Sequence, residues 1–185
     1  MKLTTKRSRQ AVAYSTAMFL LYALAGCTPQ ARDRRSSPLT TQSEASIHET
    51  SGGPINETLT NESWKHYDNQ DYERAIESAR ACVNEFGGEA SRIQLQLEKD
   101  GAEVPPTVNV SASQKAEIFK HGVLNDVAAC YYVIGRSSEC LGQIDQALSA
   151  YAEARKLAYA RCWDPKGWFW DPAQSSADRA RMLTP

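Results

Sequence analysis

Cysteine and histidine are the side chains of this sequence best able to bind a metal or act as nucleophiles, and their spacing matches no known reactive motif. No two of the five cysteines have the C-x-x-C spacing of zinc sites. His48, His66 and His121 have no metal ligand or nucleophile nearby at a recognised spacing. The chain contains no nucleophile elbow, P-loop or H-E-x-x-H sequence. We therefore expect a protein that is not an enzyme and that uses no catalytic residue, metal or cofactor.

An aromatic cluster near the C-terminus is the most conspicuous candidate for binding. It consists of Trp163, Trp168, Phe169 and Trp170, and it contains three of the four tryptophans of the chain. Exposed aromatic rings form stacking platforms for sugars or peptides. The alternative is a cap, because the last unit of a helical stack must cover its apolar face. The sequence favours the cap and leaves the stacking platform open.

The first 26 residues have the organisation of an export signal. Residues 1–10 carry four basic side chains, and residues 11–26 are uncharged and mostly apolar. The apolar run is shorter than the roughly 20 residues that a membrane-spanning helix needs. Residues 24–27, Leu-Ala-Gly-Cys, resemble the lipobox of bacterial lipoproteins. The resemblance implies that Cys27 is lipidated and becomes the N-terminus of a protein that faces the periplasm.

The lipoprotein resemblance also bears on location and partners. Thr28 stands where inner-membrane lipoproteins often have aspartate, so the outer membrane is favoured where the host has one. Several acyl chains together give stable membrane attachment. Removal of residues 1–26 takes away four basic residues and no acidic one, which changes the formal net charge from −1 to −5. No basic stripe remains for phosphate backbones, so we expect no nucleic-acid partner.

Residues 27–55 resemble a flexible tether. They are rich in serine, threonine, proline, glycine and charged residues. Such a composition buries too little apolar surface to offset the entropy lost on ordering. We expect this tether to connect the lipidated cysteine to a folded domain at 56–185.

The four remaining cysteines suggest disulfides, since an exported protein folds where disulfides persist. Cys130 and Cys140 lie on one predicted helix, about 15 Å apart along its axis, and cannot pair with each other. Cys82–Cys130 with Cys140–Cys162 is the preferred connectivity, and the crossed pairing is the alternative. Buried free thiols that act as small apolar side chains are an equally weighted interpretation.

The domain reads as helical throughout. Asn56 and Thr58 are candidate caps for the first helix, and Gly87-Gly88 is expected to end the second near Phe86. Ser111 or Ser113 is expected to cap a long fourth helix. Further helices are predicted at about 89–100, 111–140, 144–159 and 174–183. No strand is expected, and residues 88–112 form an irregular insertion.

Two predicted hairpins resemble the tetratricopeptide repeat (TPR), a helix–turn–helix unit of 34 residues. In the second hairpin the matching residues are Tyr131, Ile134, Gly135, Ala147, Tyr151 and Ala154. In the first they are Tyr72, Ala75, Ala79 and Cys82, but Ser63 replaces the glycine. The resemblance implies an all-α fold, a short TPR-like solenoid of helical hairpins. Ala75 and Ala147 are 72 residues apart, whereas two regular repeats give 68, so a strict array is not expected.

The TPR resemblance also implies a partner-binding groove on the first helix of each hairpin. By the register of the family its residues are Trp64, Tyr67, Asp68, Tyr132, Arg136 and Glu139. Tyrosine, tryptophan and arginine are frequent anchors of protein interfaces. The leading hypothesis is a membrane-anchored interaction or scaffold module that holds a protein or peptide at the cell envelope. A carbohydrate-binding accessory protein that uses residues 163–170 is the alternative.

Overall fold

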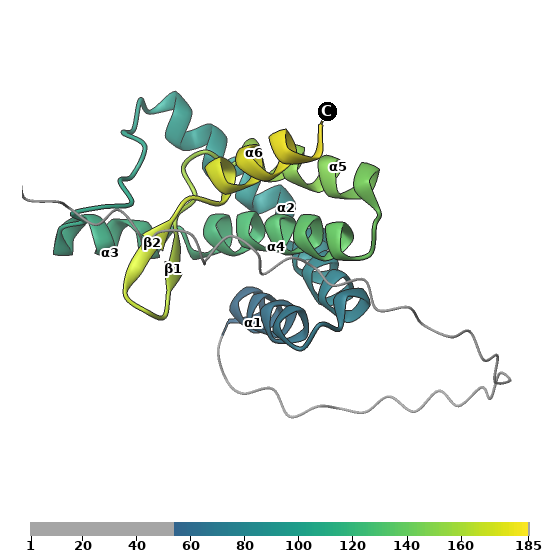
Figure 1. Cartoon of the computed structure of the whole chain (residues 1–185). Helices are drawn as coiled ribbons and strands as arrows, with labels where there is room; N and C mark the ends of the chain where they lie inside the picture. The colour runs from purple at the N-terminus through teal and green to yellow at the C-terminus, as the bar shows by residue number, and fades with distance from the viewer. Residues whose placement is uncertain (1–53, 185) are drawn as a thin grey trace, which may run out of the picture.

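The computed structural model describes residues 54–184, which form six helices and one short sheet (Figure 1). The helices are α1 (Ile55–Asp68), α2 (Tyr72–Lys99), α3 (Ala112–Lys120), α4 (Gly122–Cys140), α5 (Ile144–Arg155) and α6 (Pro172–Leu183). Strands β1 (Cys162–Asp164) and β2 (Trp168–Trp170) form an antiparallel hairpin. The predicted helical class is confirmed, apart from this hairpin. The predicted signal peptide, Cys27 and the tether up to residue 53 lie outside the described residues.

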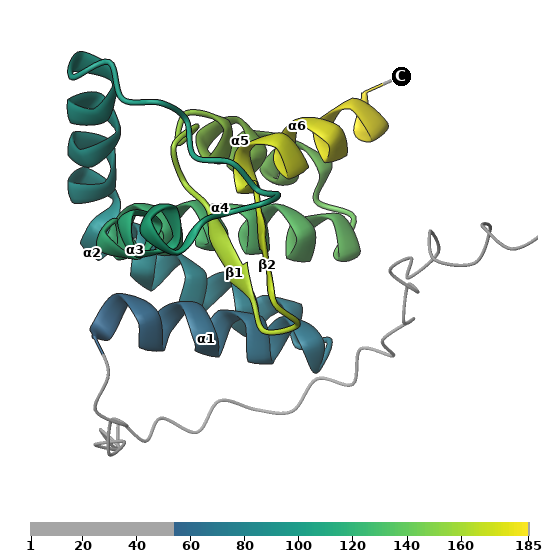
Figure 2. The same cartoon turned by 90° about the vertical axis from the view of Figure 1, so that its left-hand side faces the viewer.

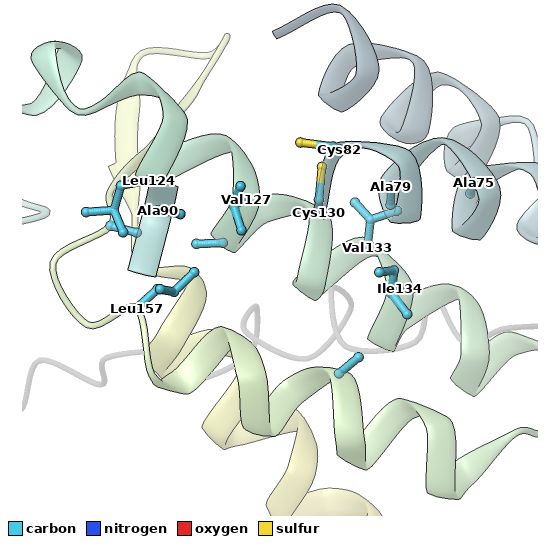
Figure 3. Packing of buried hydrophobic residues seen from close by; sticks show 13 residues of the cluster. Ala75, Ala79, Cys82, Ala90, Leu124, Val127, Cys130, Val133, Ile134 and Leu157 are labelled. Atoms are coloured by element: carbon cyan, nitrogen blue, oxygen red, sulfur yellow. The ribbon is translucent and has the colours of Figure 1, made fainter. Parts of the chain in front are cut away.

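Two helical hairpins make up the body of the domain. α1 pairs with α2, and α4 pairs with α5. α2 and α4 share the most extensive interface, while α6 packs on α5 (Figure 1). Small or branched side chains fill the centre, and several of them are drawn in Figure 3: Ala75, Ala79, Cys82, Leu124, Val127, Cys130 and Val133. Small side chains at this interface allow the helix axes to approach closely.

The first helix begins before both predicted caps, which have other roles. Pro54 is the N-cap of α1, and no side chain caps the helix. The Thr58 hydroxyl donates to the Pro54 carbonyl. Asn56 Nδ2 instead donates to Asp126 Oδ2 on α4, at 2.5 Å. The Asn56 side chain therefore serves the α1–α4 contact.

The second helix does not end at Gly87-Gly88, so that prediction was wrong. α2 continues to Lys99 and buries Ala90 and Gln94 in its second half. Gln94 Oε1 accepts the Tyr159 amide at 3.1 Å. Each glycine costs about 1 kcal/mol in a helix relative to alanine, and these tertiary contacts outweigh that cost. The predicted insertion at 88–112 is thus helical at first, and only residues 100–111 are irregular.

The predicted helix at 111–140 is two helices. Ser111 caps α3 in a capping box with Gln114, as one of the two predicted caps. The helix then breaks at His121, which has φ −98° and ψ 36°. Asn125 Nδ2 donates to the Ile118 carbonyl at 2.9 Å, and Asn125 Oδ1 accepts the Arg161 amide at 2.9 Å. These two bonds hold a bend that helical periodicity alone does not reveal.

The structure also differs from the prediction at the end of α5 and in the segment that follows it. α5 ends at Arg155 rather than near residue 159, and the segment that follows buries Leu157 and Ala160. The three-residue strands come next and are joined by a turn in which Gly167 has φ 109°. α6 begins at Pro172 after an Asp171 cap, close to the predicted residue 174.

Candidate functional site

Most of the predicted groove residues come together in the structure. Trp64 and Tyr67 of α1 lie beside Tyr132 and Arg136 of α4: the Trp64 and Tyr132 ring centroids are 6.2 Å apart, and Arg136 Nη2 donates to Tyr67 Oη at 3.0 Å. Asp68 is exposed at the last residue of α1. We refer to Trp64, Tyr67, Tyr132, Arg136 and Glu139 as the α1/α4 face.

The chain itself covers the α1/α4 face. The β-hairpin runs across α4 towards α1 (Figure 2) and places Trp170 over the aromatic residues of this face. The Trp170 centroid lies 6.1 Å from that of Trp64 and 5.2 Å from that of Tyr132. Trp170 therefore occupies a position where the sequence analysis expected a side chain of a partner.

Helix α6 also covers the α1/α4 face, through a charged side chain. Arg179 forms an ion pair with Glu139, whose side chain is only 6% exposed. Arg136 Nη1 lies 3.6 Å from the same carboxylate, and the Tyr151 hydroxyl donates to it. Desolvation and the bond to Glu139 raise the pKa of Tyr151, and the Glu139 carboxylate raises the pKa of Arg179. The Glu139 carboxylate thus finds its ion-pair and hydrogen-bond partners, two guanidinium groups and one tyrosine hydroxyl, within the chain.

The predicted aromatic cluster divides into two environments. Phe169 is buried at 4% exposure and Trp170 is half-buried, as expected of a cap. Trp163 and Trp168 remain 39% and 48% exposed. Trp163 lies 4.9 Å from Phe169 and 6.3 Å from Phe119 of α3, which is itself 49% exposed (ring centroids). We call Phe119 and Trp163 the aromatic ledge. Trp168 does not belong to it, because strand alternation directs its side chain to the other face of the hairpin, the face of Trp170.

Each exposed tryptophan of the hairpin has a lysine beside it. Lys115 Nζ lies 3.7 Å from the Trp163 ring centroid, at the border of the ledge, and Lys166 Nζ lies 6.0 Å from the ring centroid of Trp168. Both distances are within the range of cation–π contacts. Nothing in the sequence singled out Phe119 and Lys115 as parts of the ledge. Their spacing of four residues on α3 indicates a shared helix face, but it does not indicate that the hairpin packs beside them.

The predicted disulfides are absent from this structure, in which Cys82, Cys130 and Cys162 are buried free thiols. For these three cysteines the structure agrees with the alternative interpretation. Cys162 Sγ donates to the Asn125 carbonyl at 3.2 Å, near the start of α4. Cys140 ends α4 about 22 Å further along the axis, which excludes a bond between Cys140 and Cys162. Cys82 and Cys130 do lie together at the α2–α4 interface (Figure 3).

One half-buried carboxylate was not singled out from the sequence. Asp126 on α4 accepts a hydrogen bond from Asn56, and desolvation raises its pKa to about 6. The negative charge of Glu57 raises it further, while the Asn56 bond opposes the shift. Nothing in the sequence distinguished Asp126 from the other acidic residues, because its shift depends on α1 packing over α4.

Comparisons with known proteins leave the family open. The chain matches no protein-family model, no curated protein and no solved structure. Across residues 54–184, none of the helices combines the length and apolar character needed to cross a bilayer. The same described part of the chain holds no cluster of three or more histidine, cysteine, aspartate or glutamate side chains suited to a metal ion.

Proposed function

We propose that this protein is a lipid-anchored, non-enzymatic interaction module of a bacterial cell envelope. Its anchor is Cys27, and its folded part is a short stack of TPR-like helical hairpins facing the periplasm. The signal-like residues 1–26 and the lipobox-like residues 24–27 support the anchor. The outer membrane remains the favoured location because Thr28 follows the cysteine.

Packing within the second hairpin supports the TPR-like part of the proposal. A Cβ atom at Gly135 would come within 2.7 Å of three ring atoms of Tyr151. Ala147 and Ala154 are fully buried beside this contact on α5. Close approach at a glycine, filled by an aromatic ring from the next helix, is what the repeat-like spacing of these residues implies. In the first hairpin, Ser63 is buried at the matching position and its hydroxyl donates to the Thr60 carbonyl.

The exposure of the aromatic ledge is the observation that carries the proposed function. Large aromatic side chains are frequent interface anchors, and Phe119 and Trp163 lie together on this surface, 49% and 39% exposed. The α1/α4 face, by contrast, is already covered by Trp170 and α6. The ledge, rather than Tyr132 and Arg136, is therefore the proposed docking surface. Lys115 beside it favours a protein or peptide segment that combines apolar and acidic side chains.

Site-specific photo-crosslinking in intact envelopes tests this proposal. A crosslinking residue at Phe119 or Trp163 is expected to capture one defined protein, whereas one at Leu95, which is 63% exposed on α2, is not. Capture from Phe119 is expected to fall at least tenfold when Trp163→Ala is added. A chain with Cys27→Ser is expected to leave the membrane fraction and lose the capture. If ledge positions and Leu95 label the same background proteins, the docking proposal is wrong.

Carbohydrate binding remains a second candidate because exposed indole rings, here those of Trp163 and Trp168, are able to stack on sugars. Lys115 covers one side of Trp163, which leaves Trp168 as the more accessible ring. Under this alternative, peptidoglycan or polysaccharide fragments quench the tryptophan fluorescence of the purified protein, and Trp168→Ala removes the response. An unchanged spectrum at millimolar fragment eliminates the alternative.

A further inference from the structure

Two buried thiols meet where three helices join. Cys82 of α2 and Cys130 of α4 are both fully buried. Their sulfur atoms lie 3.7 Å and 3.3 Å from the same atom, the Thr60 hydroxyl oxygen of α1. Figure 3 shows the two sulfurs close to each other, Cys82 on α2 and Cys130 on α4. The pair therefore lies at the centre of the core, with α1 as its cover.

This pair differs from the other free cysteine. Cys162 is buried without a second thiol beside it, and desolvation raises the pKa of its thiol well above the usual range. The Cys130 thiol, in contrast, hydrogen-bonds to Cys82 and lowers the pKa of Cys82. A thiol with lowered pKa has more thiolate character and attacks disulfides more readily. Cys82 is thus the nucleophile of the pair.

We propose that Cys82 and Cys130 are joined by a disulfide in the exported protein and that this bond fixes α2 to α4. The proposal rests on the proposed location outside the cytoplasm, where the oxidant is a disulfide-bearing thiol oxidoreductase. The structure thereby selects one pair among those that the sequence left open, and it assigns no such bond to Cys162.

Thiol–disulfide exchange accounts for every atom and electron. The Cys82 thiolate attacks one sulfur of the oxidant disulfide, forms a mixed disulfide and releases the first oxidant thiolate. The Cys130 thiolate then attacks Cys82 Sγ, closes the Cys82–Cys130 bond and releases the second oxidant thiolate. The two electrons pass to the oxidant, and the two protons lost by the cysteines end on its two thiols.

Burial sets when this exchange takes place. Thr60 and the Asn56 carbonyl, both on α1, lie against the thiols, so the oxidant reaches them only before α1 packs or when α1 opens. The loop closed by the bond runs from 82 to 130 and contains the second half of α2, the connection at 100–111 and α3. Closing a loop of this length restricts the unfolded chain strongly.

The test follows the bond in cells and in the purified chain. Free thiols are trapped during lysis of envelope preparations, and the digest is searched by mass spectrometry for a peptide pair linked through Cys82 and Cys130. The linked pair is expected in the wild type and in Cys162→Ser, and it is expected to be lost in Cys82→Ser. Reduction of the Cys162→Ser protein is expected to lower Tm by about 10 °C.

A second arm separates the bond from the location. The reduced, purified full chain is incubated with oxidised glutathione, and the N-terminal peptide of the cellular protein is read for removal of residues 1–26. Absence of the linked pair in both settings overturns the proposed bond and leaves the anchor untouched. A linked pair with glutathione, but none in cells where residues 1–26 are retained, overturns the proposed location. Removal of residues 1–26 without a linked pair in cells overturns the bond alone.

Discussion

The α1/α4 face and the aromatic ledge are both rich in aromatic rings, yet the chain covers one and leaves the other open. The covered face receives Trp170 and Arg179 from the C-terminal segment. The ledge keeps Phe119 and Trp163 49% and 39% exposed, with Lys115 at its border. Aromatic content alone therefore does not distinguish a binding surface from a self-filled one in this protein.

Strand register explains why neighbouring tryptophans differ. Trp163 pairs with Phe169 across the hairpin, and Cys162 pairs with Trp170. Because side chains alternate between the two faces of a strand, Phe169 and Trp170 point in opposite directions. One face of the hairpin turns towards Phe119 of α3, and the other turns towards the α1/α4 face. The difference between the two regions thus depends on the strand register, because a slip of one residue would move each side chain of a strand to the opposite face.

The sharpest way to break this comparison is to remove one covered and one exposed tryptophan of the hairpin in turn. Trp170→Ala is expected to lower the free energy of unfolding by about 3 kcal/mol, because it removes the ring that covers Trp64 and Tyr132. Trp168→Ala is expected to lower it by less than about 1 kcal/mol, since its ring is half exposed. Urea unfolding followed by circular dichroism measures both. Equal losses would show that the two environments are not distinct.

A methyl group probes the packing beneath the covered face. Gly135→Ala is expected to cost about 2–3 kcal/mol, because the new Cβ overlaps the Tyr151 ring that hydrogen-bonds to Glu139. Gly88→Ala is the matched control on α2, where no atom lies within 4 Å, and it is expected to stabilise by up to about 1 kcal/mol. Thermal unfolding of the two variants gives the comparison. A neutral effect at Gly135 would mean that α4 and α5 are less closely packed than the structure has them.

A smaller effect is expected from pH, and it acts through the α1–α4 contact and not through the ledge. The pKa of Asp126 is about 6 in the folded chain and near 3.8 in the unfolded one, so the folded state binds the proton more tightly. The free energy of unfolding is therefore expected to fall by about 2 kcal/mol as pH rises from 4 to 6, and then to level off. Urea midpoints measured across this range test the sign.

Two variants isolate this titration. Asp126→Asn is expected to flatten the profile between pH 4 and 6, since the new amide oxygen still accepts the Asn56 hydrogen bond and carries no charge. Glu77→Gln, at an exposed position of α2, is expected to leave the profile unchanged. A slope that persists in Asp126→Asn would assign it to another group.

The sequence predicted the positions of most helices but not their junctions. Periodicity and caps located the starts of α1, α3 and α6 to within a few residues, because these signals are local. The passage of α2 through Gly87-Gly88 and the break at His121 depend on partners far along the chain, such as Tyr159 and Arg161. The hairpin has strands of three residues, too short for an alternating pattern to register.

The candidate site was predictable to a similar extent. The TPR register brought Trp64, Tyr67, Tyr132, Arg136 and Glu139 together correctly as neighbours. It did not indicate that the C-terminal segment folds back over them, because Trp170 and Arg179 reach this face only through the hairpin and α6. The sequence likewise grouped four aromatic residues that strand alternation then separated.

The unequal length of the first two helices divides the stability of the domain. α1 has 14 residues and α2 has 28, about 21 Å and 42 Å long, so α1 lies along only part of α2. Beyond Gly88 the long helix is secured by a few contacts, among them the Gln94–Tyr159 hydrogen bond. We therefore expect its amide protons there to exchange with solvent through partial opening, and those near Ala79 to exchange only when the whole core opens. Such a result would assign one continuous helix to two cooperative units.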